Sequence, residues 1–229
     1  MDESFWDLMS HGAGAMWVVL AFSLTGLTVV VERAIAQWKF VTRARALGDT
    51  VTRCLARGAL EEGRSACERS PSPIADVFLV GYERLGRAKL EHVVTAVHRE
   101  RLRVNQDLRA RLWMLGTIGA TAPFVGLFGT VVGIMSAMGS FKGDESVKFS
   151  MVSGPISQAL VVTAAGILVA VESVILFNYF SQRANRIATE MKLLTDEFLE
   201  LLLEQKKTDD KVEKTKRTKG DDDGDREAA

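Results

Sequence analysis

The polar side chains inside two long apolar stretches of the sequence include Thr130, Gln158, Thr163 and Glu172. Glu172 is the only charged residue between Phe149 and Gln182. A carboxylate at mid-membrane costs at least about 2.5 kcal/mol, so such a residue normally faces a protein interior or a hydrated cavity. Gln158 and Glu172 are about four turns apart and therefore lie on nearly one helical face. This pattern is typical of ion or proton movement, and the alternative is that Glu172 is a structural hydrogen-bonding residue.

Two stripes of small residues run along the same stretches. One consists of Gly126, Gly129, Thr130, Gly133 and Ala137, and the other of Ala159, Thr163, Gly166, Ala170 and Ser173. Small side chains let helix backbones approach closely in lipid, where packing drives helix association. Pro123 adds a kink that frees backbone carbonyls, which protein or water must then satisfy. The stripes predict close helix packing, and the glycines alone need no further function to explain them.

Three stretches are long enough to cross a bilayer as helices, which takes about 20 apolar residues at about 1.5 Å per residue. We expect spans over residues 13–31, 115–138 and 152–180. The first is too long for a cleaved signal peptide, and its leader MDESFWD is acidic where a signal peptide is basic. A buried helix hairpin in a soluble protein is the alternative, and three such stretches in one chain argue against it. The predicted fold class is an all-α integral membrane protein with three transmembrane helices.

Basic residues flank one end of each span, and this asymmetry predicts the orientation. They are Arg33, Lys39, Arg43 and Arg45 after the first span, Arg101, Arg103, Arg109 and Arg111 before the second, and Arg183, Arg186 and Lys192 after the third. The opposite side carries only Lys142 and Lys148. We therefore expect a periplasmic leader over residues 1–12, a periplasmic turn over residues 139–151 and a cytoplasmic C-terminus.

The segment over residues 32–111 is too polar for lipid but is patterned for helices. Its run Ser70-Pro71-Ser72-Pro73 predicts a break, because proline and the residue before it leave the helical region. No Gly or Pro occurs from Ala88 to Leu115, which predicts a helix that runs straight into the second span. A hydrophobic stripe predicts a further helix over residues 181–205. Together these segments should extend the membrane helices into a cytoplasmic helical bundle.

The remaining composition restricts the classes of function. Residues 206–229 are charged and almost without apolar side chains, which predicts a disordered, solvated tail. The chain has 29 Lys and Arg against 29 Asp and Glu, a balance that argues against a nucleic-acid binder. Cys54 and Cys67 lie in the predicted cytoplasmic part, where thiols stay reduced. The scattered His11, His92 and His98 have no zinc-binding spacing, and no nucleophile–base set or phosphate-binding loop occurs. We expect neither an enzyme nor a metal or other cofactor.

The second and third spans carry two motifs in a fixed order. The run GATAPFVGLFGTVVGIMSAM contains the pattern T-A-P-F-x-G-L-F-G-T-V-x-G-I-M, and SGPISQALVVTAAGILVAVESVILFNYF contains G-P-I-x-x-A-L-x-x-T-A-x-G-x-x-x-A. With this spacing and topology, the sequence resembles the MotA/TolQ/ExbB proton channel family, in its ExbB/TolQ branch.

The resemblance implies a three-span protein of the Gram-negative inner membrane. It implies a homo-oligomer, a pentamer, around a dimer of a single-span partner of the ExbD/TolR type. Proton flow would then drive an envelope protein, either of the TonB/TolA type or in a gliding-motility machinery. It also implies that Thr130 and Thr163 line the pore and face one another near a carboxylate of that partner.

The chain departs from the family pattern at two positions. Gln158 stands where the ExbB/TolQ pattern has Glu, and Glu172 stands where it has Pro. The membrane carboxylate has thus moved about four turns toward the cytoplasm on the same face, and we expect Glu172 to line the cytoplasmic exit of the ion path.

Two other interpretations stay open at this point. One is an oligomeric membrane scaffold that conducts no ions, in which the small-residue stripes serve only to hold copies together. The other is a secondary transporter, which the absence of an inverted repeat disfavours. The sequence leaves open which envelope process is driven and whether the ion is H⁺ or Na⁺.

Overall fold

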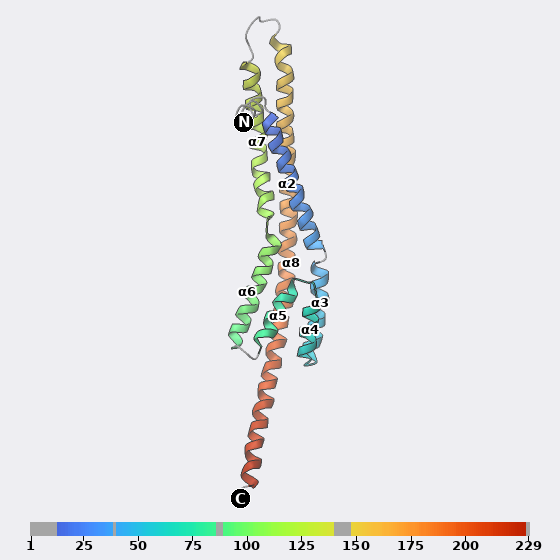
Figure 1. Ribbon diagram of the computed structural model, residues 1–229, viewed down its shortest axis with the longest axis vertical. Coiled ribbons are helices and arrows are strands. Elements are labelled where there is room, and N and C mark those ends of the chain that lie inside the picture. The colour runs from blue at the N-terminus through green and yellow to red at the C-terminus, as the bar shows by residue number, and fades with distance from the viewer. Residues whose placement is uncertain (1–12, 39, 86–88, 140–147, 228–229) are drawn as a thin grey trace, which may run out of the picture. The chain divides into compact units, whose positions relative to one another are not determined.

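The computed structural model describes residues 13–38, 40–85, 89–139 and 148–227, and every regular element in these ranges is an α-helix. The helices are α2 (Ala13–Trp38), α3 (Phe40–Ala56), α4 (Leu60–Arg69), α5 (Ile74–Arg84), α6 (Leu90–Arg109), α7 (Leu112–Gly139) and α8 (Lys148–Glu227) (Figure 1). Three helical stretches, which contain α2, α7 and the first part of α8, are long and apolar enough to cross a membrane. The predicted all-α membrane fold with three spanning helices is therefore confirmed.

The chain divides into two compact units. The span unit comprises Met1–Ile35 and Arg109–Arg183, and the bundle unit comprises Ala36–Leu108 and Ala184–Ala229. Helices α2 and α8 contribute residues to both units. The exact ends of the three predicted spans, at residues 13–31, 115–138 and 152–180, stay predictions. The predicted leader over residues 1–12 lies outside the described residues, and so does most of the predicted turn over residues 139–151.

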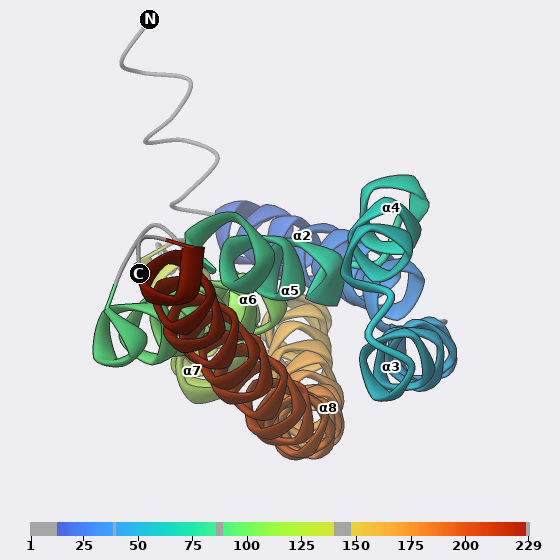
Figure 2. The ribbon, with the colours of Figure 1, turned by 90° about the horizontal axis from the view of Figure 1, so that it is seen from below.

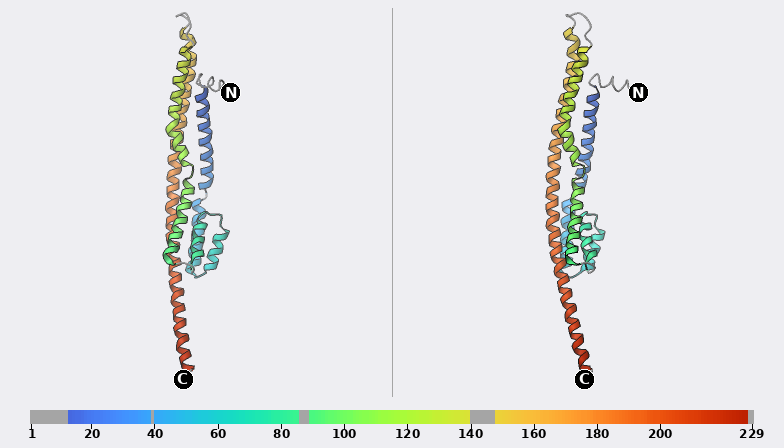
Figure 3. Two further views of the ribbon diagram at one scale, coloured as in Figure 1. Left: turned by 60° about the vertical axis from the view of Figure 1, so that its left-hand side comes forward. Right: turned by 90° about the vertical axis from the view of Figure 1, so that its left-hand side faces the viewer.

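In the span unit, α7 and the first part of α8 run side by side in opposite directions (Figures 1 and 3). Leu115 and Ala122 of α7 are fully buried, and Ala170 of α8 is buried apart from 5% of its surface. The outward faces carry large apolar side chains, among them Phe124 and Leu168, which are 71% and 70% exposed. Apolar side chains exposed in such numbers mark a surface that lipid or another protein covers.

The predicted continuous helix from residue 88 into the second span is wrong, because the helix stops between α6 and α7. Ala110 and Arg111 leave the helix, and Arg111 has a positive φ of 64°. A left-handed backbone is unfavourable for a residue with a Cβ atom. Here the Arg111 guanidinium forms an ion pair with Glu32 at 2.5 Å, and Glu32 also contacts Arg33 at 2.8 Å. The helix break is thus accompanied by a contact with Glu32 of α2, which is far away in the sequence. No Gly or Pro in the sequence marks the position of this break.

In the bundle unit, four shorter helices and the later part of α8 enclose one apolar core. Figure 2 shows α3 and α4 as neighbours in this unit. Phe198 of α8 packs against two aromatic rings of α5, with centroid distances of 4.7 Å to Phe78 and 5.3 Å to Tyr82. The proline break is confirmed, because α4 ends at Arg69 and α5 begins at Ile74.

Polar contacts also join α8 to the shorter helices of the bundle unit. Arg45 of α3 donates two hydrogen bonds to the Glu190 carboxylate, through Nε at 3.1 Å and Nη2 at 2.5 Å. Arg101 of α6 donates to Asp196 at 3.1 Å. Bidentate arginine–carboxylate pairs are the more specific kind of ion pair. These pairs supplement the apolar core in setting the register of α8 in the bundle.

The last part of the chain differs from the expected disordered tail, since α8 continues as helix as far as Glu227. A helix that is already nucleated extends at little cost, and Lys, Arg and Glu are good helix formers. Pro is absent from the sequence after residue 155, so nothing covalent stops the helix.

Candidate functional site

The two small-residue stripes meet each other within a single chain. A Cβ atom added at Gly166 would lie 2.7 Å from the Ala122 carbonyl oxygen, and one added at Gly126 would lie 3.0 Å from Cα of Thr163. Cβ atoms at Gly129 and Gly133 would lie 2.9 Å and 2.8 Å from α8 side chains. Real Cβ atoms essentially never show the distances below 3.0 Å, and the 3.0 Å at Gly126 is tighter than nearly all real Cβ contacts. The close approach of α7 and α8 therefore depends on glycine at these positions.

This contact changes the role that the stripes can have. The glycines are occupied by packing between two helices of one chain, and they are therefore not free to hold copies of the chain together. The scaffold interpretation, in which the stripes serve oligomerisation, loses its basis. Pro123 lies inside α7 in the same region. Because proline has no N–H group, it leaves the Gly119 carbonyl without its usual donor from within the helix.

Both threonines predicted for the ion path point to backbone groups. The Thr163 hydroxyl donates to the Gly126 carbonyl of α7 at 2.7 Å. The Thr130 hydroxyl donates to the Leu127 carbonyl of its own helix at 2.7 Å, and Thr130 is only 7% exposed. Thr163 therefore forms a polar link between α7 and α8, and Thr130 is buried one turn away from the glycine that accepts this bond.

Gln158 and Glu172 occupy a different surface, because both are exposed on α8. Nine residues separate Thr163 from Glu172, which corresponds to about half a turn around the helix axis at 3.6 residues per turn. Around Glu172 the surface is apolar, with Leu168, Val171 and Ile175 exposed by 70%, 52% and 62%. Within the described part of the chain, no side chain forms a hydrogen bond or ion pair with Glu172.

The four predicted ion-path residues consequently fall into two groups. Thr130 and Thr163 lie at or near the contact between α7 and α8, whereas Gln158 and Glu172 face away from the span unit. A single chain does not bring the two groups together. Any site that contains Glu172 must be completed by another molecule.

Two further hydroxyls lie on the outward side of α7, and the sequence analysis did not select them. Thr117 is exposed, and Thr121 lines an apolar groove of about 350 Å³ between α2 and α7. Phe124 and Phe128 also line this groove. The sequence pattern that could have identified them is the spacing of four residues between two threonines in an apolar run, because it predicts two hydroxyls on one helical face.

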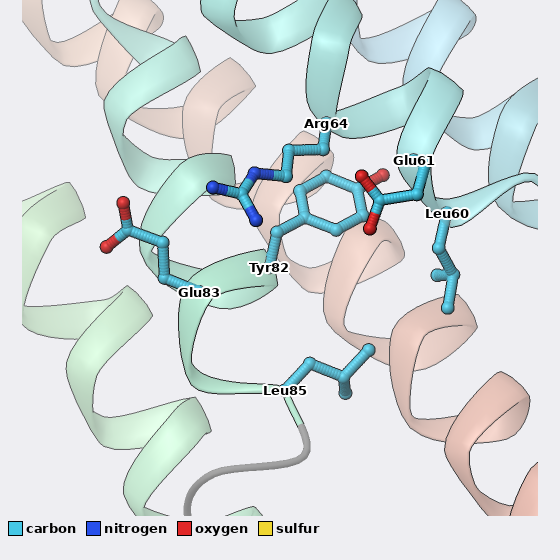
Figure 4. Close-up of a pocket in the computed structure, with 6 residues that line it drawn as sticks. All are labelled: Leu60, Glu61, Arg64, Tyr82, Glu83 and Leu85. Carbon is cyan, nitrogen blue, oxygen red and sulfur yellow. The ribbon is translucent and has the colours of Figure 1, made fainter.

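A separate pocket of about 540 Å³ lies in the bundle unit, lined by Leu60, Glu61, Arg64, Tyr82, Glu83 and Leu85 (Figure 4). Arg64 already donates to Glu68 at 3.0 Å. The Tyr82 ring is buried, and burial raises the pKa of its hydroxyl above the usual range. The pocket combines charges of both signs and carries no residue that the sequence analysis predicted for the site.

The comparisons with known proteins agree with this architecture. The MotA/TolQ/ExbB proton channel family matches residues 69–193, more than half of the chain. The Tol-Pal system protein TolQ of Haemophilus influenzae is 27% identical over 198 residues, which is 82% of this chain and 87% of that protein. TolQ of Pseudomonas aeruginosa is 27% identical over 221 residues, covering 90% of this chain and 96% of that protein.

A similar relationship exists to the biopolymer transport protein ExbB. The ExbB protein of Xanthomonas campestris pv. campestris is 41% identical over 100 residues, covering 44% of this chain and 39% of that protein. The family match spans the later bundle helices, the helix break at Arg111, and both motif-bearing helices. The chain therefore belongs to the MotA/TolQ/ExbB proton channel family, and it is a membrane protein of the ExbB/TolQ branch.

Proposed function

We propose that this protein is the inner-membrane channel subunit of a motor driven by the proton-motive force. Copies of the chain, five by analogy with the family, surround a dimer of a single-span ExbD/TolR-like partner. Proton passage then drives an envelope protein in transport, envelope maintenance or gliding motility. In this arrangement the N-terminus is periplasmic and the bundle unit is cytoplasmic, as the distribution of basic residues predicts.

The observation that carries the proposal is the exposed position of Glu172. A carboxyl group exposed on an apolar helix surface is unfavourable against lipid, by at least about 2.5 kcal/mol at mid-membrane. Its surface is therefore covered by protein or water in the assembled state. A titratable group in such a position can take up and release protons, which an amide such as Gln158 cannot do.

The energy available is sufficient for mechanical work. Each elementary charge that crosses a potential of 100 mV releases about 2.3 kcal/mol. Repeated transfers can therefore bias a conformational cycle between the channel subunits and the partner.

The decisive experiment is to purify the protein with its single-span partner, count the subunits and measure proton flux in liposomes. Glu172→Gln preserves size and hydrogen bonding but removes titration. We expect this variant to assemble normally and to lose flux. Normal flux through an intact assembly would reduce Glu172 to a structural residue, and a monomeric particle would contradict the channel itself.

The two threonines provide a second test within the same assay. Thr130→Val and Thr163→Val keep the shape of the side chain and remove the hydroxyl. If the hydroxyls serve the ion path, both variants assemble and lose flux. If they serve packing, Thr163→Val loosens the contact between α7 and α8, while Thr130→Val, whose bond stays within one helix, has the smaller effect.

A further inference from the structure

The depth of Glu172 in the span unit follows from the contacts of α7 with α8. A Cβ atom at Gly119 would contact Val174 and the Ala170 carbonyl oxygen, so Gly119 lies at the height of residues 170–174 of α8. Thr117 and Thr121 are each two residues from Gly119, or about 3 Å along the axis at 1.5 Å per residue. Thr117, Thr121 and Glu172 therefore share one level of the membrane.

The three side chains face outward from different helices of the same chain. Thr117 and Glu172 are exposed, and Thr121 lines the groove beside α7. Both hydroxyls already donate to their own helix, Thr117 to the Trp113 carbonyl at 3.0 Å and Thr121 to the Thr117 carbonyl at 2.8 Å. Their oxygen lone pairs remain able to accept a hydrogen bond from a protonated carboxyl group.

Rotation about the membrane normal keeps every residue of a copy at the same depth. In a ring of the kind proposed above, neighbours meet through two different surfaces, one from each copy. The exposed surface of α8 that carries Glu172 then contacts a different surface of the next copy at the same depth in the membrane. We infer that Glu172 of one copy is seated against Thr117 and Thr121 on α7 of the adjacent copy. This inference rests on the proposed ring.

Helix α2 also carries hydroxyls near this level, because its Gly26 lies against Ser173. Ser23 and Thr28 are exposed and Thr25 is half-buried, and Thr25 and Thr28 are three residues apart on one face. Thr117 and Thr121 form a similar pair on α7, and Thr121 also opens into a groove of about 350 Å³ that has room for a side chain of another copy. The groove therefore favours α7 over α2.

The pairing gives the Glu172 carboxyl group a defined setting. Glu172 would be enclosed between two copies at the level of two hydroxyls, where lipid does not reach it. Each interface of the ring would hold one such carboxyl group, so the site is complete only in the oligomer.

Cysteine cross-linking in native membranes tests the pairing. The native Cys54 and Cys67 are buried in the bundle unit, so they remain in place. The doubly substituted chains Glu172→Cys with Thr117→Cys, and Glu172→Cys with Thr121→Cys, are treated with a short thiol cross-linker. We expect a ladder of covalent multimers on a non-reducing gel, whereas each single substitution should yield dimers at most.

The matched control is Gln158→Cys with Thr117→Cys. Gln158 is exposed on the same helix, but it lies about 21 Å from Glu172 along α8 at 1.5 Å per residue. This control should give no ladder. A ladder from Glu172→Cys with Ser23→Cys, Thr25→Cys or Thr28→Cys, and none with α7, would overturn the inference in favour of α2.

The oligomeric mass of each variant separates this inference from the proposed function. Absence of any ladder from an intact oligomer overturns the pairing and leaves the channel assembly standing. A monomeric wild-type protein would overturn both.

Discussion

Replacing Gly166 by alanine tests the closest approach between α7 and α8. The added Cβ atom would lie 2.7 Å from the Ala122 carbonyl oxygen and 3.1 Å from Cα of Gly126. Both neighbours belong to the helix backbone, which cannot rotate away as a flexible side chain would. The two helices must therefore move apart, and the packing along the whole stripe loosens.

The magnitude can be isolated by comparison with Gly26→Ala. Gly26 lies inside α2, and the atom nearest to its added Cβ is Leu115 Cδ2 at 3.7 Å, an ordinary van der Waals contact. Both substitutions gain about 1 kcal/mol of helix propensity, so this gain cancels in the comparison. Overpacking costs about 1–3 kcal/mol. Gly166→Ala should therefore be less stable than Gly26→Ala by this amount, roughly 5- to 150-fold in the unfolding equilibrium.

The assay is reversible unfolding of the purified protein in mixed detergent micelles, followed by circular dichroism. Gly166→Ala should unfold at a lower denaturant midpoint than Gly26→Ala, and Gly26→Ala at the same midpoint as the wild type or a higher one. Equal midpoints for the two variants would mean that the α7–α8 contact is looser than the structure shows, and the reasoning from the glycine stripe would fail.

Three further predictions concern single side chains. Thr163→Val should lower the stability by about 0.5–1.5 kcal/mol, because it removes the hydrogen bond to the Gly126 carbonyl, and the same detergent unfolding assay measures the loss. Arg45 lowers the pKa of Glu190 through its hydrogen bonds. The pair therefore stabilises the folded state fully above the unfolded Glu pKa of about 4.3. This stabilisation is lost as the pH falls through the lower pKa that Glu190 has in the folded state. A thermal midpoint that falls no more steeply in acid for the wild type than for Glu190→Gln would contradict this. Burial raises the pKa of the Cys67 thiol to about 12, so at pH 8 it should react with maleimide only after unfolding, as mass spectrometry can check.

Several features of this protein could be predicted from the sequence because they depend on local composition. Three long uncharged stretches satisfy the length that a bilayer demands, whatever the rest of the chain does. Pro71 and Pro73 interrupt the helix between α4 and α5 through their own ring geometry. The small residues around Gly126 and Gly166 predicted close helix packing, because small side chains allow a close approach of the backbones whichever helix is the partner.

Other features depended on contacts between residues far apart in the chain. Arg111 adopts a left-handed backbone beside Glu32, an ion pair that no local pattern marks, and this explains the missed helix break. The family resemblance assigned Thr163 to the ion path and the lone carboxylate assigned Glu172 to it, because the sequence cannot tell which face of α8 meets α7. The tertiary structure directs Thr163 to the Gly126 carbonyl and leaves Glu172 outside, since one helix can bury only the face that its neighbour covers.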